Sequence, residues 1–186
     1  MNLEVEVVAF DGRHESADFD CGVDELNRWL VQSAGQQQKR GTCRTFFLQP
    51  GGDMKEWRAV GFHDVTPKTI LGFYALASAQ VPIEDLPPKT GLPRSVPVLR
   101  LCRLAVDTRF KGMGLGDALL MEVITKAAEV SDAIGMAGLF VDSKADARTF
   151  YERYGFTAAQ SSPDKLWLPL KKVIEFKEAI DQGSGP

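Results

Sequence analysis

The sequence predicts a mixed α/β (α+β) fold, and three features of its patterning support this prediction. Residues 3–10 alternate apolar and acidic side chains with the period of two that is typical of a half-buried strand. Residues 115–135 instead place apolar side chains on one face of a helix. This helix lies between apolar strands expected at 98–106 and 137–143, so it is expected to cross over a sheet.

Length and composition indicate a single domain spanning residues 1–186. A chain of 186 residues with 44% hydrophobic content can bury roughly 70% of the surface that its unfolded form exposes. Its cysteines, Cys21, Cys43 and Cys102, are widely spaced without a C-x-x-C pair, which argues against a disulfide framework and a zinc site. The N-terminus lacks the basic start of a signal peptide, and no apolar run reaches membrane-spanning length. We expect a cytoplasmic protein that binds no metal and no membrane.

The remaining elements follow from periodicity and from turn residues. A helix is predicted over 20–41, because Asp20 can cap its first turn and Gly41 can end its last. The proline-rich segment 82–97 is expected to be irregular. The other predicted elements are strands at 42–49, 70–81 and 165–170, a turn at 50–53, and a helix over 145–156 that Gly155 ends.

The stretch RFKGMGLGDALL, residues 109–120, places a glycine at every second position before an apolar helix. A dinucleotide fingerprint needs a third glycine where this chain has Asp117, and the Gly-Lys-Ser/Thr of a P-loop is also missing. Two interpretations remain. The loop either offers free N–H groups and a helix N-terminus to a pyrophosphate, with added charge from Arg109 and Lys111, or it is only a strand-to-helix turn.

The pattern Arg-x-x-Gly-x-Gly, at Arg109, Gly112 and Gly114, resembles motif A of the GCN5-related N-acetyltransferases (GNAT). The segment ADARTFYERYGF resembles a later helix and strand of that superfamily, and the two segments cover about residues 98–158. The resemblance implies the GNAT fold: a central mixed, mostly antiparallel twisted sheet with helices on both faces. It also implies a splayed strand pair that holds acetyl-CoA.

The same resemblance implies which residues bind acetyl-CoA. The backbone of the strand before the glycine loop is expected to pair with the pantetheine arm, and the loop with the pyrophosphate. Lys144 stands where many members of the superfamily carry asparagine. The cofactor-binding residues are expected to be Leu104, Ala105, Val106, Arg109, Lys111, Gly112, Met113, Gly114, Gly116 and Phe150.

Three further segments, FDCGVDELNRWLVQSAGQQQKRGTCRTFFL, GFYALASAQV and PVLRLCRLAVD, resemble the acetyltransferase toxins of bacterial toxin–antitoxin pairs. That resemblance implies acetylation of the amino acid on charged tRNA, so that aminoacyl-tRNA is the acceptor and translation stops. It also implies a ribbon-helix-helix antitoxin from the same operon. A homodimer is expected, because two-fold dimers are common in the superfamily and are the most frequent oligomers generally.

Tyr151 is the candidate catalytic acid, because acetyl transfer needs a proton donor for the departing thiolate and a phenol stays protonated at neutral pH. The resemblance also places a tyrosine at this point. Tyr151 and Tyr154 lie at helical spacing with other apolar residues, so both could instead be core residues, and Tyr154 is the second candidate acid.

No general base is evident, since His14 and His63 are far in sequence from these segments and are expected at the surface. An α-amine, with a pKa of about 8 against about 10.4 for lysine, needs less help from a base. Water, or a water wire to a carboxylate, would then be sufficient.

The net charge of −3 predicts no overall attraction to RNA, so RNA binding would need a local cluster of basic residues. Residues 27–52 contain four basic residues and no acidic one, and 89–111 contain six against Asp107 alone. Such residues can also merely solvate a surface. Arg100 and Arg103 lie in an apolar strand and point to opposite faces, and Arg103 is favoured for the acceptor cleft. The RNA-binding residues are expected to be Arg28, Lys39, Arg40, Arg44, Arg94, Arg100 and Arg103.

Two other functions fit the same residues. The first is a GNAT enzyme that acetylates a small amine or a protein amine. The second is a non-enzymatic acyl-CoA-binding module, in which the C-terminal segment VIEFKEAI forms a docking helix.

Overall fold

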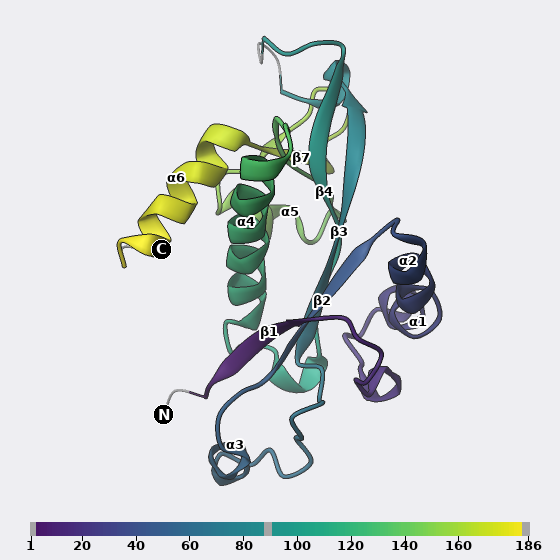
Figure 1. Cartoon of the computed structure of the whole chain (residues 1–186), viewed down its shortest axis with the longest axis vertical. Coiled ribbons are helices and arrows are strands. Elements are labelled where there is room, and N and C mark those ends of the chain that lie inside the picture. Colours follow the sequence, from purple (N-terminus) through teal and green to yellow (C-terminus); the bar gives the residue numbers. More distant parts are fainter. Residues whose placement is uncertain (1–2, 88–90, 184–186) are drawn as a thin grey trace. The chain divides into compact units, whose positions relative to one another are not determined.

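The computed structural model describes residues 3–87 and 91–183 of the chain, and it confirms the mixed α/β class (Figure 1). Within these residues the strands are β1 (Val5–Ala9), β2 (Arg44–Pro50), β3 (Gly72–Pro82), β4 (Ser95–Val106), β5 (Gly138–Asp142), β6 (Thr157–Ala158) and β7 (Lys165–Pro169). They are ordered β1-β2-β3-β4-β5-β7-β6 in one sheet. The pairs β1–β2, β2–β3, β5–β7 and β6–β7 are antiparallel, whereas β4–β5 is parallel, so the sheet is mixed and mostly antiparallel as expected.

The helices connect these strands. They are α1 (Asp24–Gln32), α2 (Ala34–Arg40), α3 (Met54–Ala59), α4 (Leu115–Ala133), α5 (Arg148–Glu152) and α6 (Leu170–Asp181), with short 3₁₀ turns η1 (Ser16–Asp18), η2 (Ile83–Asp85) and η3 (Thr108–Phe110). None of the helices in the described ranges combines the length and the apolar character that a bilayer crossing needs.

The chain forms two compact units. Unit 1 comprises residues 1–76 and 103–120, and unit 2 comprises 77–102 and 121–186. The strands β3 and β4 and the helix α4 each continue from one unit into the other. Folding of residues 1–186 as a single domain remains a prediction, which one cooperative unfolding transition would support.

The core of unit 1 is aromatic. Phe73 on β3 is fully buried, and Trp29 of α1 stacks on it with 5.8 Å between ring centroids. Phe19 meets the same ring edge-on at 5.3 Å. Around α3 the ring of Trp57 packs edge-on against Phe110 at 6.2 Å. Since aromatic pairs add about 0.5–1.5 kcal/mol beyond their burial, these contacts anchor α1 and η3 to the unit.

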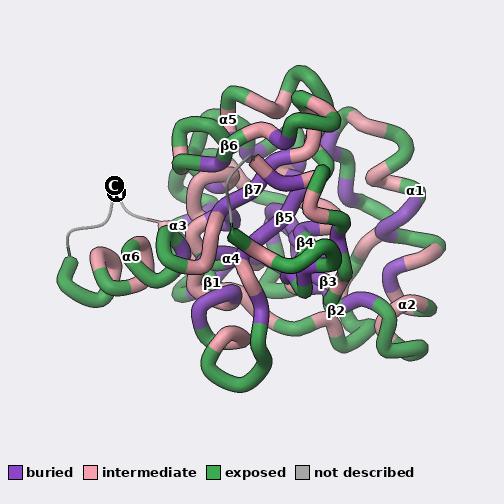
Figure 2. Tube along the Cα trace, turned by 90° about the horizontal axis from the view of Figure 1, so that it is seen from above, coloured by how far each residue is buried: buried purple, intermediate pink, exposed green. Residues whose placement is uncertain are grey.

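The core of unit 2 gathers on β5 and β7, which Figure 2 draws largely as buried. Phe140 and Trp167 pack there with Val98 of β4. Gly138 lets these strands approach closely, because a Cβ at this position would lie 2.3 Å from the carbonyl oxygen of Leu168. Helix α6 contacts both β5 and β7, and its Val173 is fully buried. The expected C-terminal helix therefore exists, but one of its faces is already covered.

The prediction of a single helix over 20–41 is wrong, because the structure has two helices, α1 and α2, which meet at Ser33. The backbone there departs from helical geometry, with φ −116° and ψ −34°. Asp20 is not the helix cap either, since Val23 occupies the N-cap position. The Asp20 carboxylate accepts hydrogen bonds from the N–H of Gly22 and from Asn27 Nδ2 instead. Gly41 does end α2, in the left-handed conformation with φ 72°.

Other boundaries also differ from expectation. β4 begins at Ser95, inside the segment expected to be irregular. Val96 and Val98 are buried on either side of the exposed Pro97, in a strand pattern that prolines had obscured. The helix expected over 145–156 is confined to α5. Helix α3 was missed, although Asp53 caps it by accepting a hydrogen bond from the N–H of Lys55.

Candidate functional site

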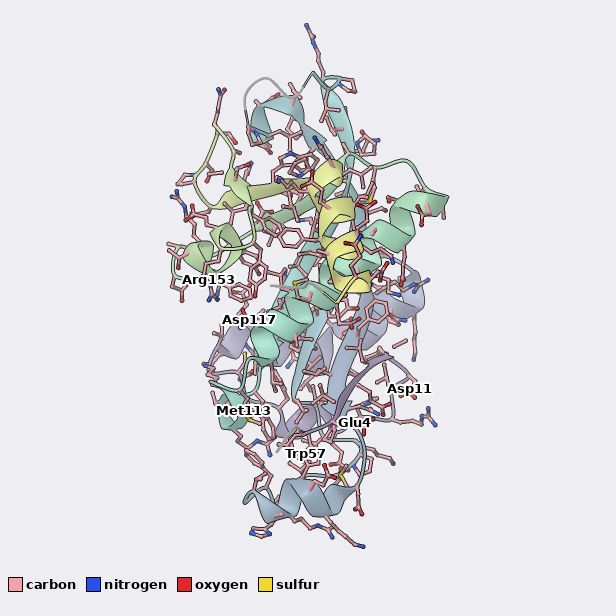
Figure 3. All side chains as sticks on the ribbon, turned by 90° about the vertical axis from the view of Figure 1, so that its left-hand side faces the viewer. Glu4, Asp11, Trp57, Met113, Asp117 and Arg153 are labelled. Carbon is pink, nitrogen blue, oxygen red and sulfur yellow. The ribbon has the colours of Figure 1, made fainter. Side chains whose placement is uncertain are left out.

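The glycine stretch is a loop that leads directly into α4. Gly112 and Gly114 have φ of 81° and 75°, in the left-handed region that only glycine enters at little cost. Met113 between them is 38% exposed and is labelled in Figure 3. The first N–H groups of a helix have no acceptor within it, and here the N–H of Ala118 is bonded to Gly114 O. Left-handed glycines that lead into a helix N-terminus are an arrangement that suits an anion such as a pyrophosphate.

Replacing Gly114 with alanine is expected to destabilise the protein by about 1–2 kcal/mol, because a Cβ strains the left-handed conformation. Steric space is not the reason, since no atom lies within 4 Å of the position that the methyl group would take. The KM for acetyl-CoA is expected to rise as well. Urea unfolding and steady-state kinetics measure both effects, with Gly135→Ala as the control because Gly135 has equal space without a positive φ. Equal behaviour of the two variants would contradict the prediction.

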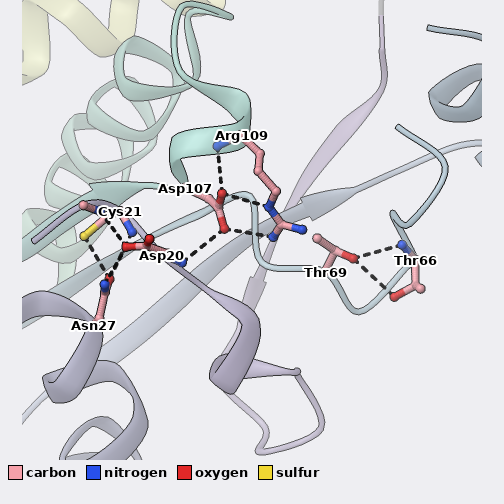
Figure 4. Close-up of polar contacts among 8 residues, drawn as sticks. Asp20, Cys21, Asn27, Thr66, Thr69, Asp107 and Arg109 are labelled. Carbon is pink, nitrogen blue, oxygen red and sulfur yellow. Dashed lines mark hydrogen bonds and ion pairs between the residues drawn. The ribbon is translucent and has the colours of Figure 1, made fainter. Parts of the chain in front are cut away.

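Asp107 organises the turn that precedes the glycine loop (Figure 4). Asp107 is fully buried. One carboxylate oxygen accepts hydrogen bonds from Arg109 N and Nε, and the other accepts from Arg109 Nη2 and from the N–H of Asp20. The hydrogen bond to Asp107 raises the pKa of Arg109, whose side chain remains 43% exposed. The Arg109 guanidinium is therefore held by a buried carboxylate.

Lys111 is likewise engaged, since its Nζ donates a hydrogen bond to the carbonyl oxygen of Cys21 at 3.0 Å. Arg109 and Lys111 were expected to bring positive charge to the loop, and their hydrogen bonds also hold the segment that leads into it. Cys21 itself is buried, and burial raises the pKa of its thiol. None of these long-range partners was indicated by the sequence pattern.

The segment expected to meet the pantetheine arm forms the end of β4. Ala105 is buried, whereas Leu104 and Val106 are partly exposed. Gly72 on β3 was missed by sequence reasoning, although a Cβ there would lie 2.8 Å from the carbonyl oxygen of Ala105. β4 pairs with β5 over Leu99–Leu101. The divergence of these two strands beyond that register remains a prediction.

Tyr151 lies on α5 and is only 6% exposed. Its ring packs edge-on against Phe150 and Phe156, at 5.1 and 5.5 Å between centroids. Burial raises the pKa of Tyr151 to about 12, and no residue within the described ranges hydrogen-bonds to its hydroxyl group. The phenol is therefore held protonated far above neutral pH, as an acid requires, although the residue also has the contacts of a core side chain.

Tyr154 is partly exposed and packs against Phe150 and Phe176. The guanidinium of Arg153, labelled in Figure 3, lies 5.5 Å from the ring of Phe150 and 6.0 Å from that of Tyr154. Tyr154 is thus the more solvated of the two tyrosines.

His14 is not the surface residue that was expected, because its side chain is only 7% exposed. Nε2 lies 2.6 Å from Gln49 Oε1, and the ring packs on Phe47 with centroids 4.6 Å apart. His14 is therefore a packed side chain. His63 is exposed, as predicted.

In unit 1, the basic residues of segment 27–52 lie at the surface. Arg28, Lys39, Arg40 and Arg44 are all exposed. Arg44 donates a hydrogen bond from Nη1 to the carbonyl oxygen of Gln38. Arg103 is partly buried, with its guanidinium 5.5 Å from the centre of the Trp29 ring. This cation–π contact ties β4 to α1.

Unit 2 contains the other two basic residues of this set. Arg94 is exposed, and Arg100 forms an ion pair with Asp142. For metal binding, the described ranges contain no group of three or more His, Cys, Asp or Glu side chains arranged to hold an ion.

The class of protein follows from comparison with known families. Residues 90–170 match the family model described as an acetyltransferase (GNAT) domain. A "tRNA-acetylating toxin" from Mycobacterium tuberculosis is 39% identical over 156 residues, which are 82% of this chain and 84% of the relative. A "probable toxin TacT" from Sinorhizobium fredii is 27% identical over 87% of this chain and 88% of the relative.

Solved structures agree with these sequence matches. AtaT complexed with acetyl-methionyl-tRNAfMet superposes with a TM-score of 0.77 at 26% identity, covering 94% of this chain and 98% of that one. A tyrosine-to-phenylalanine variant of KacT superposes with a TM-score of 0.79, also at 26% identity, covering 92% and 98%. The chain belongs to the GNAT acetyltransferases, in the family of the tRNA-acetylating toxins. It is therefore an N-acetyltransferase, and the non-enzymatic interpretation is set aside.

Proposed function

We propose that this protein transfers the acetyl group of acetyl-CoA to the α-amine of the amino acid on aminoacyl-tRNA and thereby blocks translation. The observation that carries the proposal is the pair of left-handed glycines at the N-terminus of α4, which suits a pyrophosphate. Support comes from the M. tuberculosis relative named for tRNA acetylation and from the AtaT complex with acetylated tRNA. Related structures contain acetyl-CoA.

The glycine loop and the end of β4 would bind two different parts of acetyl-CoA, the pyrophosphate and the pantetheine arm. The N–H groups of Gly112, Met113, Gly114 and Gly116 bind the pyrophosphate, which the positive end of the α4 dipole also favours. The backbone of Leu104–Val106 pairs with the pantetheine amides, and Phe150 contributes apolar contact. Arg109 and Lys111 act mainly by fixing this loop, since both side chains are already engaged.

In the reaction, the neutral α-amine attacks the thioester carbon and forms a C–N bond. The tetrahedral intermediate then collapses, the C–S bond breaks, and the sulfur leaves with its electron pair. Tyr151 donates its phenolic proton to that thiolate, while the attacking nitrogen loses a proton to water. A pKa of about 12 keeps the phenol loaded with this proton. An amine with a pKa of about 8 leaves enough neutral nucleophile at pH 7 without a strong base.

The acceptor's RNA would be bound by arginines and lysines at the surface, which exchange counterions for phosphates. In unit 1 these are Arg28, Lys39, Arg40 and Arg44, with Arg103 on β4. In unit 2 they are Arg94 and Arg100. Because phosphate contacts release counterions, acceptor affinity is expected to fall as salt is raised.

We also propose that a ribbon-helix-helix antitoxin from the same operon neutralises the protein, and that the protein acts as a homodimer in the cytoplasm. Support for the antitoxin comes from related structures: AtaT has been solved bound to the C-terminus of the antitoxin AtaR, and KacTA in complex with DNA. Size-exclusion chromatography with light scattering tests the dimer.

The function is tested by offering labelled acetyl-CoA to total charged tRNA, uncharged tRNA, a protein extract and a panel of polyamines. Label on charged tRNA alone is expected, at the α-amine. Label on polyamines or protein would support an acetyltransferase activity but show that the acceptor is not aminoacyl-tRNA. Label on uncharged tRNA would exclude the α-amine as the site.

The pH dependence follows from the raised pKa of Tyr151. The kcat/KM for an α-amine acceptor is expected to rise with amine deprotonation and then stay level to at least about pH 10.5, because the acid loses its proton only near pH 12. Stopped-time assays between about pH 6 and 10.5, using an amino acid amide as the acceptor, measure this profile. A fall centred near pH 10 would show an acid with an ordinary phenol pKa and would point to the more solvated Tyr154.

A further inference from the structure

Residues 20–22, here called the N-terminal turn, bind the segment that leads into the glycine loop, residues 107–111 (Figure 4). The two segments are far apart in sequence but are joined mainly through the backbone of the N-terminal turn. The bonds run from Asp20 N–H to Asp107 Oδ2 (3.3 Å), from Thr108 N–H to Asp20 O (2.8 Å), and from Lys111 Nζ to Cys21 O (3.0 Å). The position of the loop's first residues thus depends on the shape of the N-terminal turn.

Asn27 on α1 holds that turn in shape. Its Nδ2 donates a hydrogen bond to Asp20 Oδ1 at 2.7 Å, and its Oδ1 accepts from the N–H of Cys21 at 3.0 Å. The same Asp20 oxygen accepts from the N–H of Gly22, and these two bonds, that from Gly22 first, lower the pKa of Asp20. The amide of Asn27 therefore uses both of its ends on the N-terminal turn.

The helix that carries Asn27 is itself anchored. Trp29, two residues further along, is buried in the stack on Phe73 and lies under the guanidinium of Arg103. A fixed helix gives Asn27 a fixed position, because its side chain has only two rotatable bonds. A continuous chain of contacts thus runs from α1 through the N-terminal turn to residues 107–111.

We propose that Asn27 is a positioning residue for acetyl-CoA. It binds neither the cofactor nor the reacting atoms. By fixing the N-terminal turn, it holds residues 107–111 and so keeps the glycine loop preorganised for the pyrophosphate. This inference rests on the proposed role of the glycine loop. Its expected signature is weaker cofactor binding with an unchanged chemical step, because preorganisation lowers the ordering cost of binding.

The test compares two substitutions of Asn27. Asn27→Ala removes both bonds and is expected to raise the Kd and the KM for acetyl-CoA about tenfold, with kcat at saturating cofactor within about threefold. Asn27→Asp has the same shape and still accepts from Cys21 N–H, but it cannot donate to Asp20 and brings a second carboxylate against it. It is expected to raise both constants at least as much.

Calorimetry without an acceptor measures the Kd, and steady-state kinetics measure KM and kcat. Gln32→Ala, at an exposed position of the same helix, is the matched control and is expected to bind like the wild type. Wild-type affinity in Asn27→Asp would overturn the proposal, because a packing role alone tolerates an isosteric residue. A parallel loss of kcat and thermal stability in both variants would also overturn it, as would a wild-type protein that binds no acetyl-CoA. Only the last result would count against the proposed function as well.

Discussion

Replacing Tyr151 with phenylalanine is expected to lower kcat by about 10² to 10⁴-fold, the usual contribution of a positioned general acid. The fold is expected to survive, because the ring keeps its contacts with Phe150 and Phe156 and the lost hydroxyl leaves no hydrogen-bond partner within the described ranges unsatisfied. Single-turnover acetylation of charged tRNA measures the rate, and thermal unfolding checks the fold. The KM for acetyl-CoA is expected to change little.

Tyr154→Phe is the matched control for this experiment. Tyr154 lies three residues after Tyr151 and also contacts Phe150, but it is more exposed than Tyr151. Its variant is expected to keep its rate within a few-fold of the wild type. If Tyr154→Phe is the inactive variant and Tyr151→Phe the active one, the assignment of the acid is reversed. If neither is impaired, neither phenol is the acid.

Replacing Asp107 with alanine is expected to reduce the free energy of unfolding by about 2–4 kcal/mol, which is about 5–15 °C in Tm for a chain of this size. The buried carboxylate accepts four hydrogen bonds, and its removal leaves the N–H groups of Asp20 and Arg109 without that acceptor. The Arg109 guanidinium can be partly hydrated, since its side chain is 43% exposed, and this limits the loss.

Asp142→Asn provides the comparison for that effect. Asp142 pairs with Arg100, and both side chains are substantially exposed, so the ion pair is expected to contribute less than about 1 kcal/mol. Denaturant unfolding of both variants separates a buried hydrogen-bond centre from a surface ion pair. Similar losses in the two variants would contradict the central role given to Asp107.

The sequence was most informative where the determining physics is local. Alternation of apolar side chains predicted β1, and helical periodicity predicted α4, because both depend on neighbours a few residues away. Gly112 and Gly114 were expected to form a loop before a helix, and their left-handed backbone agrees, since only the lack of a Cβ is needed. The family resemblance rested on these same local motifs.

The candidate site was predicted only in part. The residues of the loop and of α5 were predicted from sequence, but the partners that hold them were not. Gly72 carries no motif, and its role appears only because β4 passes 2.8 Å from where its Cβ would lie. His14 was expected at the surface and is packed on Phe47 instead.

By itself, the sequence determined the mixed α/β class, the glycine loop and the tyrosine-bearing helix, since periodicity and glycine content act over short stretches of chain. Only the tertiary structure decided what Asp20, Asp107 and Lys111 do. The local pattern around Asp20 is typical of a helix cap, yet the residue bonds to a carboxylate 87 residues away, and Lys111 bonds to a carbonyl 90 residues away. Such contacts depend on how distant segments are packed together, and no pattern within a segment encodes that packing.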